Sequence, residues 1–111
     1  MNLVVLQGTL SSEPIERTLA SGLNVMSWDV VTETDLGRSS VPVQWNDPSS
    51  RVCDLGKGDR VVVIGHVRQR FFRARGQTVA RTEVVGAHLA KPTQKAAVSR
   101  ILERARCALA A

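Results

Sequence analysis

The chain has 111 residues, 43% of them hydrophobic and 23% charged, so it can form one domain with a modest core and is not disordered by composition. No apolar run approaches the ~18 residues of a membrane-spanning helix. No basic segment precedes the apolar residues at the start, so we expect no signal peptide, no membrane contact and a cytoplasmic location.

Positive charge is concentrated in the second half of the chain. Residues 1–50 carry two basic and six acidic side chains, whereas residues 51–111 carry thirteen basic and four acidic ones. Arginine supplies twelve of the fifteen cations, and its flat guanidinium suits phosphate contact better than the ammonium of lysine. This distribution is typical of a protein that binds nucleic acid or another polyanion, although charge alone also fits an ordinary solvated surface.

The two cysteines, Cys53 and Cys107, lie far apart in the sequence with no second pair of metal ligands near either. This spacing argues against a zinc site and, in the cytoplasm, against a structural disulfide. We expect reduced thiols and no bound metal or cofactor, with a bridge between subunits as the open alternative.

The first part of the chain alternates as β-strands do. Residues 2–10 place two sets of side chains on opposite faces, and residues 26–32 do so again after a break that contains Arg17. Gly8 within the first strand indicates a bulge or a tight bend. Trp28 has apolar neighbours two residues away on both sides, so we expect it in the core.

A turn around Leu36 and Gly37 leads to a third strand at residues 41–45. Pro42 has no N–H for a ladder, so this strand is expected to lie at an edge or to bend there. Residues 47–55 then resemble a short helix, with Asp47 at the N-cap and a proline at the first helical position.

Residues 58–85 are expected to form the element that matters most, a long β-hairpin. Its first strand begins at Val61 and has apolar residues on one face, while the other face continues as His66, Arg68, Arg70 and Phe72. A basic turn with Arg73, Arg75 and Gly76 follows, and a return strand from residue 78 carries Arg81 and finishes near residues 88–90.

The row of arginines with an aromatic ring suits single-stranded nucleic acid. Cationic side chains follow the phosphates, while a ring such as Phe72 stacks on a base without reading its identity. The competing interpretation is a solvated basic face, in which exposed ion pairs contribute ~0–1 kcal/mol each.

The last segment, residues 92–111, follows a boundary at Lys91 and Pro92 and has a helical period. Thr93 is a candidate cap. Its apolar residues recur at three- and four-residue steps and form one stripe: Val98, Ile101, Leu102, Ala105 and Leu109. An isolated helix of this length is marginal in water, so the stripe should be buried against its own domain or against a partner chain.

The expected order is three strands, a short helix, two strands and a final helix. This predicts a mainly β protein, a five-stranded OB-fold barrel at residues 1–91 with a C-terminal amphipathic α-helix at residues 92–111. The loops and open face of such barrels commonly bind oligonucleotides.

Several segments together resemble the bacterial single-stranded DNA-binding proteins, and most of all their small actinobacterial forms. The resemblance covers residues 2 to about 90. It is carried by residues 2–10 (NLVVLQGTL), Pro14, Arg17, Ser21, Gly22, residues 55–59 (LGKGD), 63–65 (VIG), 67–70 (VRQR) and 81–84 (RTEV).

The resemblance implies an OB-fold that binds single-stranded DNA without sequence preference, and that forms a homo-oligomer, a tetramer or a dimer. It implies a nucleoid-associated protein acting in DNA replication, repair or recombination, with replication or repair proteins as further partners. Together with the charge pattern, it yields these candidate DNA contacts: Thr9, Arg17, Trp45, His66, Arg68, Arg70, Phe72, Arg73, Arg75 and Arg81.

The chain departs from the family pattern in three places. The loop at residues 33–40 is short and lacks an aromatic residue. Trp45 corresponds to a stacking aromatic of the family, but its alternation with Val41 and Val43 would bury it, so both a core role and a DNA-stacking role stay open. The family has a flexible acidic tail that recruits partners, whereas here we expect a basic helical segment at residues 92–111.

An enzyme is not expected, because His66 and His88 have no acid or thiol at a telling spacing and no phosphate-binding glycine loop is present. Two other functions compete with DNA binding. One is an oligomeric OB-fold adaptor with weak or no DNA affinity that acts through the terminal helix, and the other is an RNA-binding OB-fold protein.

Overall fold

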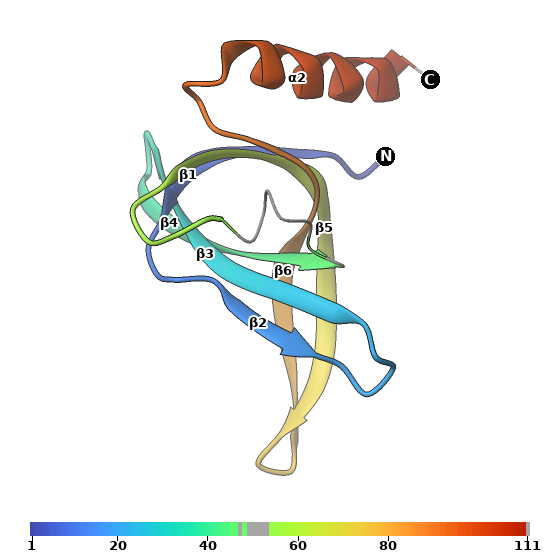
Figure 1. The fold of residues 1–111 in the computed structure, drawn as a ribbon. Helices are drawn as coiled ribbons and strands as arrows, with labels where there is room; N and C mark the ends of the chain where they lie inside the picture. The colour runs from blue at the N-terminus through green and yellow to red at the C-terminus, as the bar shows by residue number, and fades with distance from the viewer. Residues whose placement is uncertain (47, 49–53, 111) are drawn as a thin grey trace.

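The computed structural model describes residues 1–46, 48 and 54–110, and this part of the chain forms six strands and one helix (Figure 1). The elements are β1 Val4–Leu10, β2 Ile15–Thr18, β3 Asn24–Thr34, β4 Gly37–Asn46, β5 Arg60–Ala74, β6 Gln77–Ala90 and α2 Lys95–Ala110. The short helix expected at residues 47–55 lies outside the described residues, apart from Pro48, Asp54 and Leu55. Its expected cap, Asp47, and Cys53 also lie outside them.

The strands form one sheet in the order β1-β5-β6-β4-β3-β2, and β1 also pairs with β3. This second pairing, with Leu10 opposite Val30, closes a five-stranded barrel of β1, β3, β4, β5 and β6. The β4–β6 pairing is parallel and starts at Val43, directly after Pro42, so the missing N–H of the proline lies outside that ladder. The expected mainly β, OB-like barrel with one C-terminal helix is confirmed.

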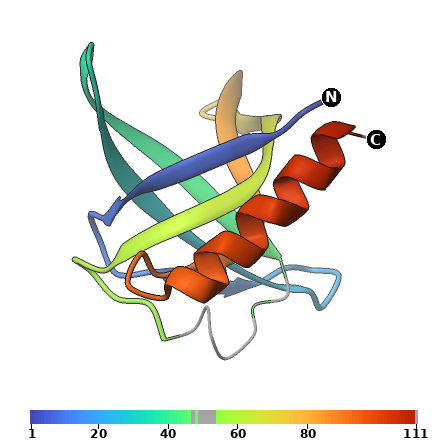
Figure 2. The ribbon, with the colours of Figure 1, turned by 90° about the horizontal axis from the view of Figure 1, so that it is seen from above.

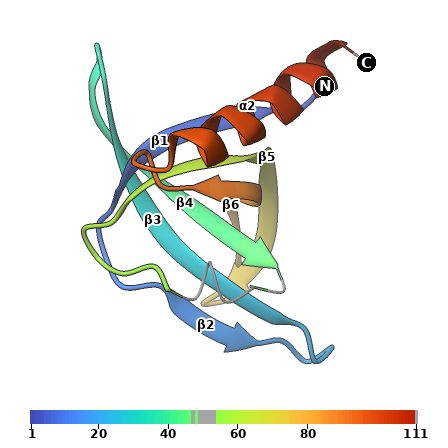
Figure 3. The same cartoon turned by 45° about the horizontal axis from the view of Figure 1, so that its top comes forward.

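The sequence does not predict the short strand β2, because residues 15–18 lie in the break between the first two expected strands. All four residues are exposed, so β2 lacks the alternation of buried and exposed side chains that identifies a strand. Its backbone pairs with β3, with Arg17 opposite Val25, and Figure 3 shows β2 beside β3 at the end of the sheet.

The core fills the interior of the barrel. Trp28 is 3% exposed, and Val61 and Val63 point inward from β5, as the alternation predicts. Val62 and Ile64 point to the outside of the barrel, where they are also buried. This part of β5 is apolar on both faces because it is covered on both faces.

The helix α2 provides that outer cover. Ile101 and Ala105 pack on Val62, Ile64 and Ala90, and Figure 2 shows α2 lying across β5 close to β1. Three residues of the apolar stripe, Val98, Ile101 and Ala105, therefore pack against their own domain, whereas Leu102 and Leu109 are exposed. The helix begins one residue later than a cap at Thr93 would place it, because the carbonyl of Gln94 accepts the hydrogen bond from Val98 N at 2.9 Å.

A bulge marks the point where β5 and β6 leave the barrel. Ile64 pairs with His88 and Gly65 with Gly86, so β6 contributes one extra residue, Ala87. Both glycines are required by close contacts, since a Cβ at Gly65 would collide with the carbonyl of Val85 and one at Gly86 with the ring of Trp45. Beyond the bulge the hairpin continues as an arm, residues 66–85. Its base still pairs with β4 at Val84 and Val85, and its outer part projects from the barrel (Figure 1).

The arm is anchored at its base and closed at its tip. At the base, the side chain of Asn2 donates to Val67 O at 2.6 Å and accepts from Val67 N at 2.8 Å, so it extends the pairing of β1 with β5. At the tip, Arg75 and Gly76 have φ angles of 52° and 75°, which a two-residue type I′ turn requires. The expected turn is confirmed at Arg75 and Gly76, whereas Arg73 belongs to β5 and pairs with Thr78.

Candidate nucleic-acid interface

A surface groove of about 540 Å³ lies between β2 and the arm, with β3 and β4 as its floor. One wall is formed by Ser12, Ile15 and Arg17, the floor by Ser27, Trp28, Asp29, Val43 and Gln44, and the other wall by Arg70, Phe72, Arg81 and Glu83. The floor strands are the second and third strands of the barrel, and the walls come from the loop after the first strand and from the last hairpin. This is the face on which OB-folds bind oligonucleotides.

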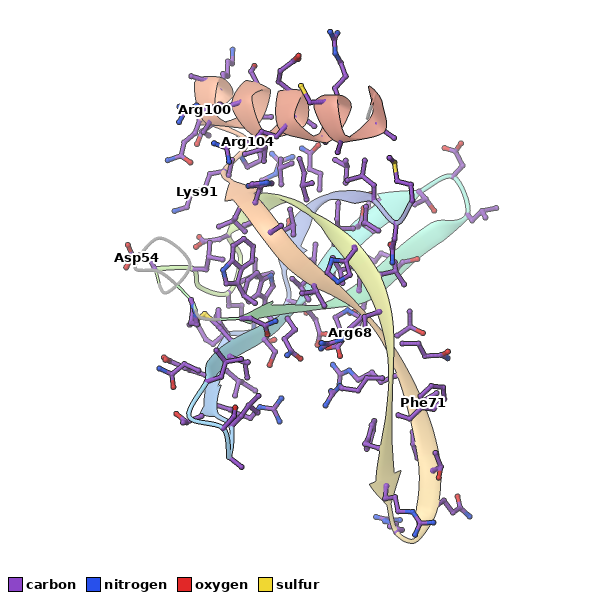
Figure 4. The ribbon with its side chains drawn as sticks, turned by 90° about the vertical axis from the view of Figure 1, so that its right-hand side faces the viewer. Asp54, Arg68, Phe71, Lys91, Arg100 and Arg104 are labelled. Carbon is purple, nitrogen blue, oxygen red and sulfur yellow. The ribbon has the colours of Figure 1, made fainter. Side chains whose placement is uncertain are left out.

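Glu83 organises the arginines of the arm. It is 3% exposed, and its Oε1 accepts from Arg70 Nε at 2.9 Å and from Arg68 Nη2 at 3.1 Å. Arg68 lies at the base of the arm, on the strand opposite Glu83 (Figure 4). The shared carboxylate fixes both guanidinium groups and offsets one of their two charges, so the row is less positive than its sequence indicates.

Arg70 and Phe72 form a joint platform. The guanidinium carbon of Arg70 lies 5.6 Å from the centre of the Phe72 ring, within the range of a cation–π contact. Because Arg70 uses Nε for Glu83, its terminal nitrogens are left for a ligand. Phe72 is 38% exposed, which leaves part of its ring for stacking.

Arg81 and Arg17 are the cations of the groove without an ion-pair partner among the described residues. Arg81 pairs directly with Arg70 across the β5–β6 ladder, so the two like charges lie on the same face of the arm. Such a pair favours a counterion, because like charges directly opposite one another repel. Arg17 is exposed on β2, on the other wall.

The structure thus brings together four of the predicted contacts along one groove, namely Arg17, Arg70, Phe72 and Arg81, with Arg68 fixed behind them. His66 is exposed near the base of the arm and does not line the groove. Arg73 and Arg75 are exposed near the tip of the arm, also away from the groove.

Thr9 and Trp45 lie elsewhere. Thr9 lines a separate depression with Arg38 and Arg60. In this depression Arg38 Nε is 3.7 Å from Glu33 Oε1. Trp45 is half-buried and packs against the barrel core, with its ring centroid 6.3 Å from that of Trp28 and the planes at 21°. Of the two roles left open for Trp45, its position is that of a core residue.

Sequence reasoning missed the acidic and amide side chains of the groove, Glu83, Asp29 and Gln44. A signal for Glu83 exists, since it is the only acid in the arm and faces basic residues across the hairpin. Asp29 and Gln44 carry no such signal, because they meet the arm only through the closure of the barrel. Phe71 was also missed; it is 66% exposed, on the face of the arm opposite to Phe72.

Among the described residues, no three His, Cys, Asp or Glu side chains converge as metal ligands, and Cys107 is a free, exposed thiol. The described part of the chain also holds no helix with the length and apolar character that crossing a membrane requires. In comparisons with known proteins, no family model matches the chain and no curated protein is significantly similar to it.

Proposed function

We propose that the protein binds single-stranded DNA along the groove between β2 and the arm, without requiring a particular sequence. The observation that carries this proposal is the convergence of Arg17, Arg70 and Arg81 with the exposed ring of Phe72 on the face that OB-folds use. The resemblance of residues 2 to about 90 to bacterial single-stranded DNA-binding proteins supports the same proposal.

The chemistry of the groove favours unpaired strands. Phe72 can stack only on a base whose face is free, and a duplex keeps its base faces covered. Arg70 and Arg81, opposite one another in the ladder, and Arg17 on the other wall supply positions for phosphates. Each phosphate that they neutralise releases counterions from the strand, which favours binding at low salt.

One groove alone supplies modest affinity. A single stacked base contributes about 1–3 kcal/mol, whereas a Kd of 1 μM corresponds to ~8 kcal/mol. Several copies bound to one strand would add their contributions through a high effective concentration. A homo-oligomer, a dimer or a tetramer, is therefore part of the proposal, with protection of unpaired DNA in replication, repair or recombination as its role.

The test is the binding of a fluorescently labelled oligo-dT, followed by anisotropy over a series of salt concentrations. Intrinsic fluorescence is a less direct readout, because Trp28 is only 3% exposed on the floor of the groove and Trp45 does not line it. We expect Arg81→Gln to lower the salt slope by about 0.7, the value for one phosphate contact with a single strand. Arg104→Gln, on the exposed side of α2 and outside the groove, is the matched control and should leave the slope unchanged.

Absence of binding at low salt would refute the proposal and favour an adaptor role. Parallel titrations with an RNA of the same sequence and with duplex DNA test whether the protein binds RNA instead of single-stranded DNA. Equal or tighter binding of RNA would replace DNA by RNA as the ligand, and equal binding of duplex would show that charge alone drives the association.

A further inference from the structure

The floor of the groove carries a hydrogen-bond acceptor that is unpaired within the part of the chain that the structure describes. Asp29 lies there on β3, half-buried, and its carboxylate has no hydrogen bond or ion pair with the described residues. The backbone oxygen of Asp29 accepts from Ser11 N at 3.1 Å. Glu83 lines the same groove, and both of its ion pairs use Oε1, which leaves Oε2 without a partner among the described residues.

This arrangement orients a bound strand. A phosphate is disfavoured on a floor that carries the carboxylate of Asp29, since like charges repel in a partly desolvated site. Arg17 and Arg81, in contrast, belong to the two walls. The phosphates therefore follow the walls, and a base lying next to Phe72 turns its edge to the floor.

We propose that the floor selects bases whose exocyclic amine lies at position 4 of a pyrimidine or position 6 of a purine, cytosine and adenine, over thymine, and that Asp29 is the residue that determines this preference. The inference rests on the proposed function and adds a preference of base composition to it. An ionised carboxylate can only accept hydrogen bonds. The N4 amine of cytosine donates to such a group, whereas thymine presents the O4 acceptor at the same position.

Gln44 does not cancel the preference. It is 8% exposed, and its Nε2 donates to Asn46 Oδ1 at 3.2 Å, so at least one of its amide hydrogens is engaged within the protein. The carboxylate of Asp29 has no such partner in the described part of the chain. The carboxylate of Asp29 is therefore available to accept a hydrogen bond from the edge of a base.

The experiment compares two oligonucleotides on the full chain, oligo-dT and oligo-5-methyl-dC, at mildly alkaline pH and one fixed salt concentration. The two share the methyl group. They differ at position 4, which is a carbonyl in thymine and an amine in 5-methylcytosine, and at the adjacent N3, which carries a hydrogen in thymine alone. We expect oligo-5-methyl-dC to bind about fivefold to tenfold more tightly than oligo-dT. This comparison needs no variant, so it does not depend on a substituted chain folding.

The variant Asp29→Asn should reduce the ratio of the two affinities to within about twofold, because its amide can also donate to the O4 of thymine. Asp35→Asn is the matched control. It removes the same charge from the exposed β3–β4 turn, outside the groove, and should leave the ratio unchanged.

Three outcomes would overturn the inference: equal affinities for the two oligonucleotides, a ratio that Asp29→Asn leaves unaltered, or an equal loss of the ratio in Asp35→Asn. The first two exclude selection by Asp29 while DNA binding stands. The third attributes the preference to the overall charge. Failure of both oligonucleotides to bind at low salt would instead refute the proposed function itself.

Discussion

Arg70 and Glu83 are joined across the arm by a contact of 2.9 Å between Nε and Oε1, and Arg68 shares the same oxygen at 3.1 Å. Glu83 is almost fully buried, whereas both arginines are about one third exposed. The carboxylate thus determines how the two cations are presented along the groove.

Replacing Glu83 by Gln should separate the contribution of this cluster to stability from its contribution to DNA binding. We expect the free energy of unfolding to fall by about 1–2 kcal/mol, less than for a fully buried pair because water screens the arginines. The salt slope of oligo-dT binding should become steeper by roughly 0.7, since a cation is released for phosphate contact. Urea denaturation and anisotropy measure the two quantities, and an unchanged slope would mean that the arginines of this cluster do not reach the DNA.

Phe72→Leu tests the stacking platform. Loss of the aromatic ring should weaken oligo-dT binding by about 1–3 kcal/mol with no change in salt slope, because stacking involves no phosphate. Phe71→Leu is the matched control, since Phe71 is the more exposed of the two rings but lies on the other face of the arm. If Phe71→Leu weakens binding more than Phe72→Leu does, the DNA lies on that other face.

Ile101→Ala tests the docking of α2 on its own barrel. Ile101 is 9% exposed and packs on Val62 and Ile64, so truncation should lower the free energy of unfolding by about 2–4 kcal/mol. Leu102→Ala, at a 41% exposed position on the same helix, should cost less than about 1 kcal/mol. Equal losses in the two variants would indicate that Leu102 is covered too, as in an oligomer built through α2.

Gly86→Ala tests the bulge. The new Cβ collides with the ring of Trp45, so we expect a loss of about 1–3 kcal/mol in stability and a shift in tryptophan emission as the ring moves. At Gly56 the nearest atom to an added Cβ is Glu13 Oε2 at 3.4 Å, so Gly56→Ala should change neither quantity appreciably. Unaltered emission in Gly86→Ala would show that the ring and the bulge are not in contact.

The alternation of residues predicts the barrel well because five of its strands each have a buried apolar set. Val61 and Val63 illustrate this, as does Trp28. The bulge could not be predicted, since Ala87 differs in no way from an ordinary strand residue until its partner strand is known. The strand β2 could not be predicted either, because all its side chains are exposed and give no periodic signal.

The basic wall of the groove could be predicted, whereas its floor could not. Arg70, Phe72 and Arg81 follow one another on a single hairpin, so spacing along the sequence already places them on one face. Asp29 and Gln44 come from β3 and β4, and only the closure of the barrel brings them near the arm. Patterns within single strands contain no information about such contacts between elements.

The bulge at Gly65 and Gly86 also divides one continuous ladder into two dynamic regimes. Amide hydrogens of residues 61–64, sealed between the core and α2, can exchange with solvent only when the whole barrel opens. Those farther out on the arm have mostly exposed side chains around them and can exchange through local fraying. A ligand held by the arm would therefore slow deuterium uptake on the outer side of this boundary and leave the inner side as it was.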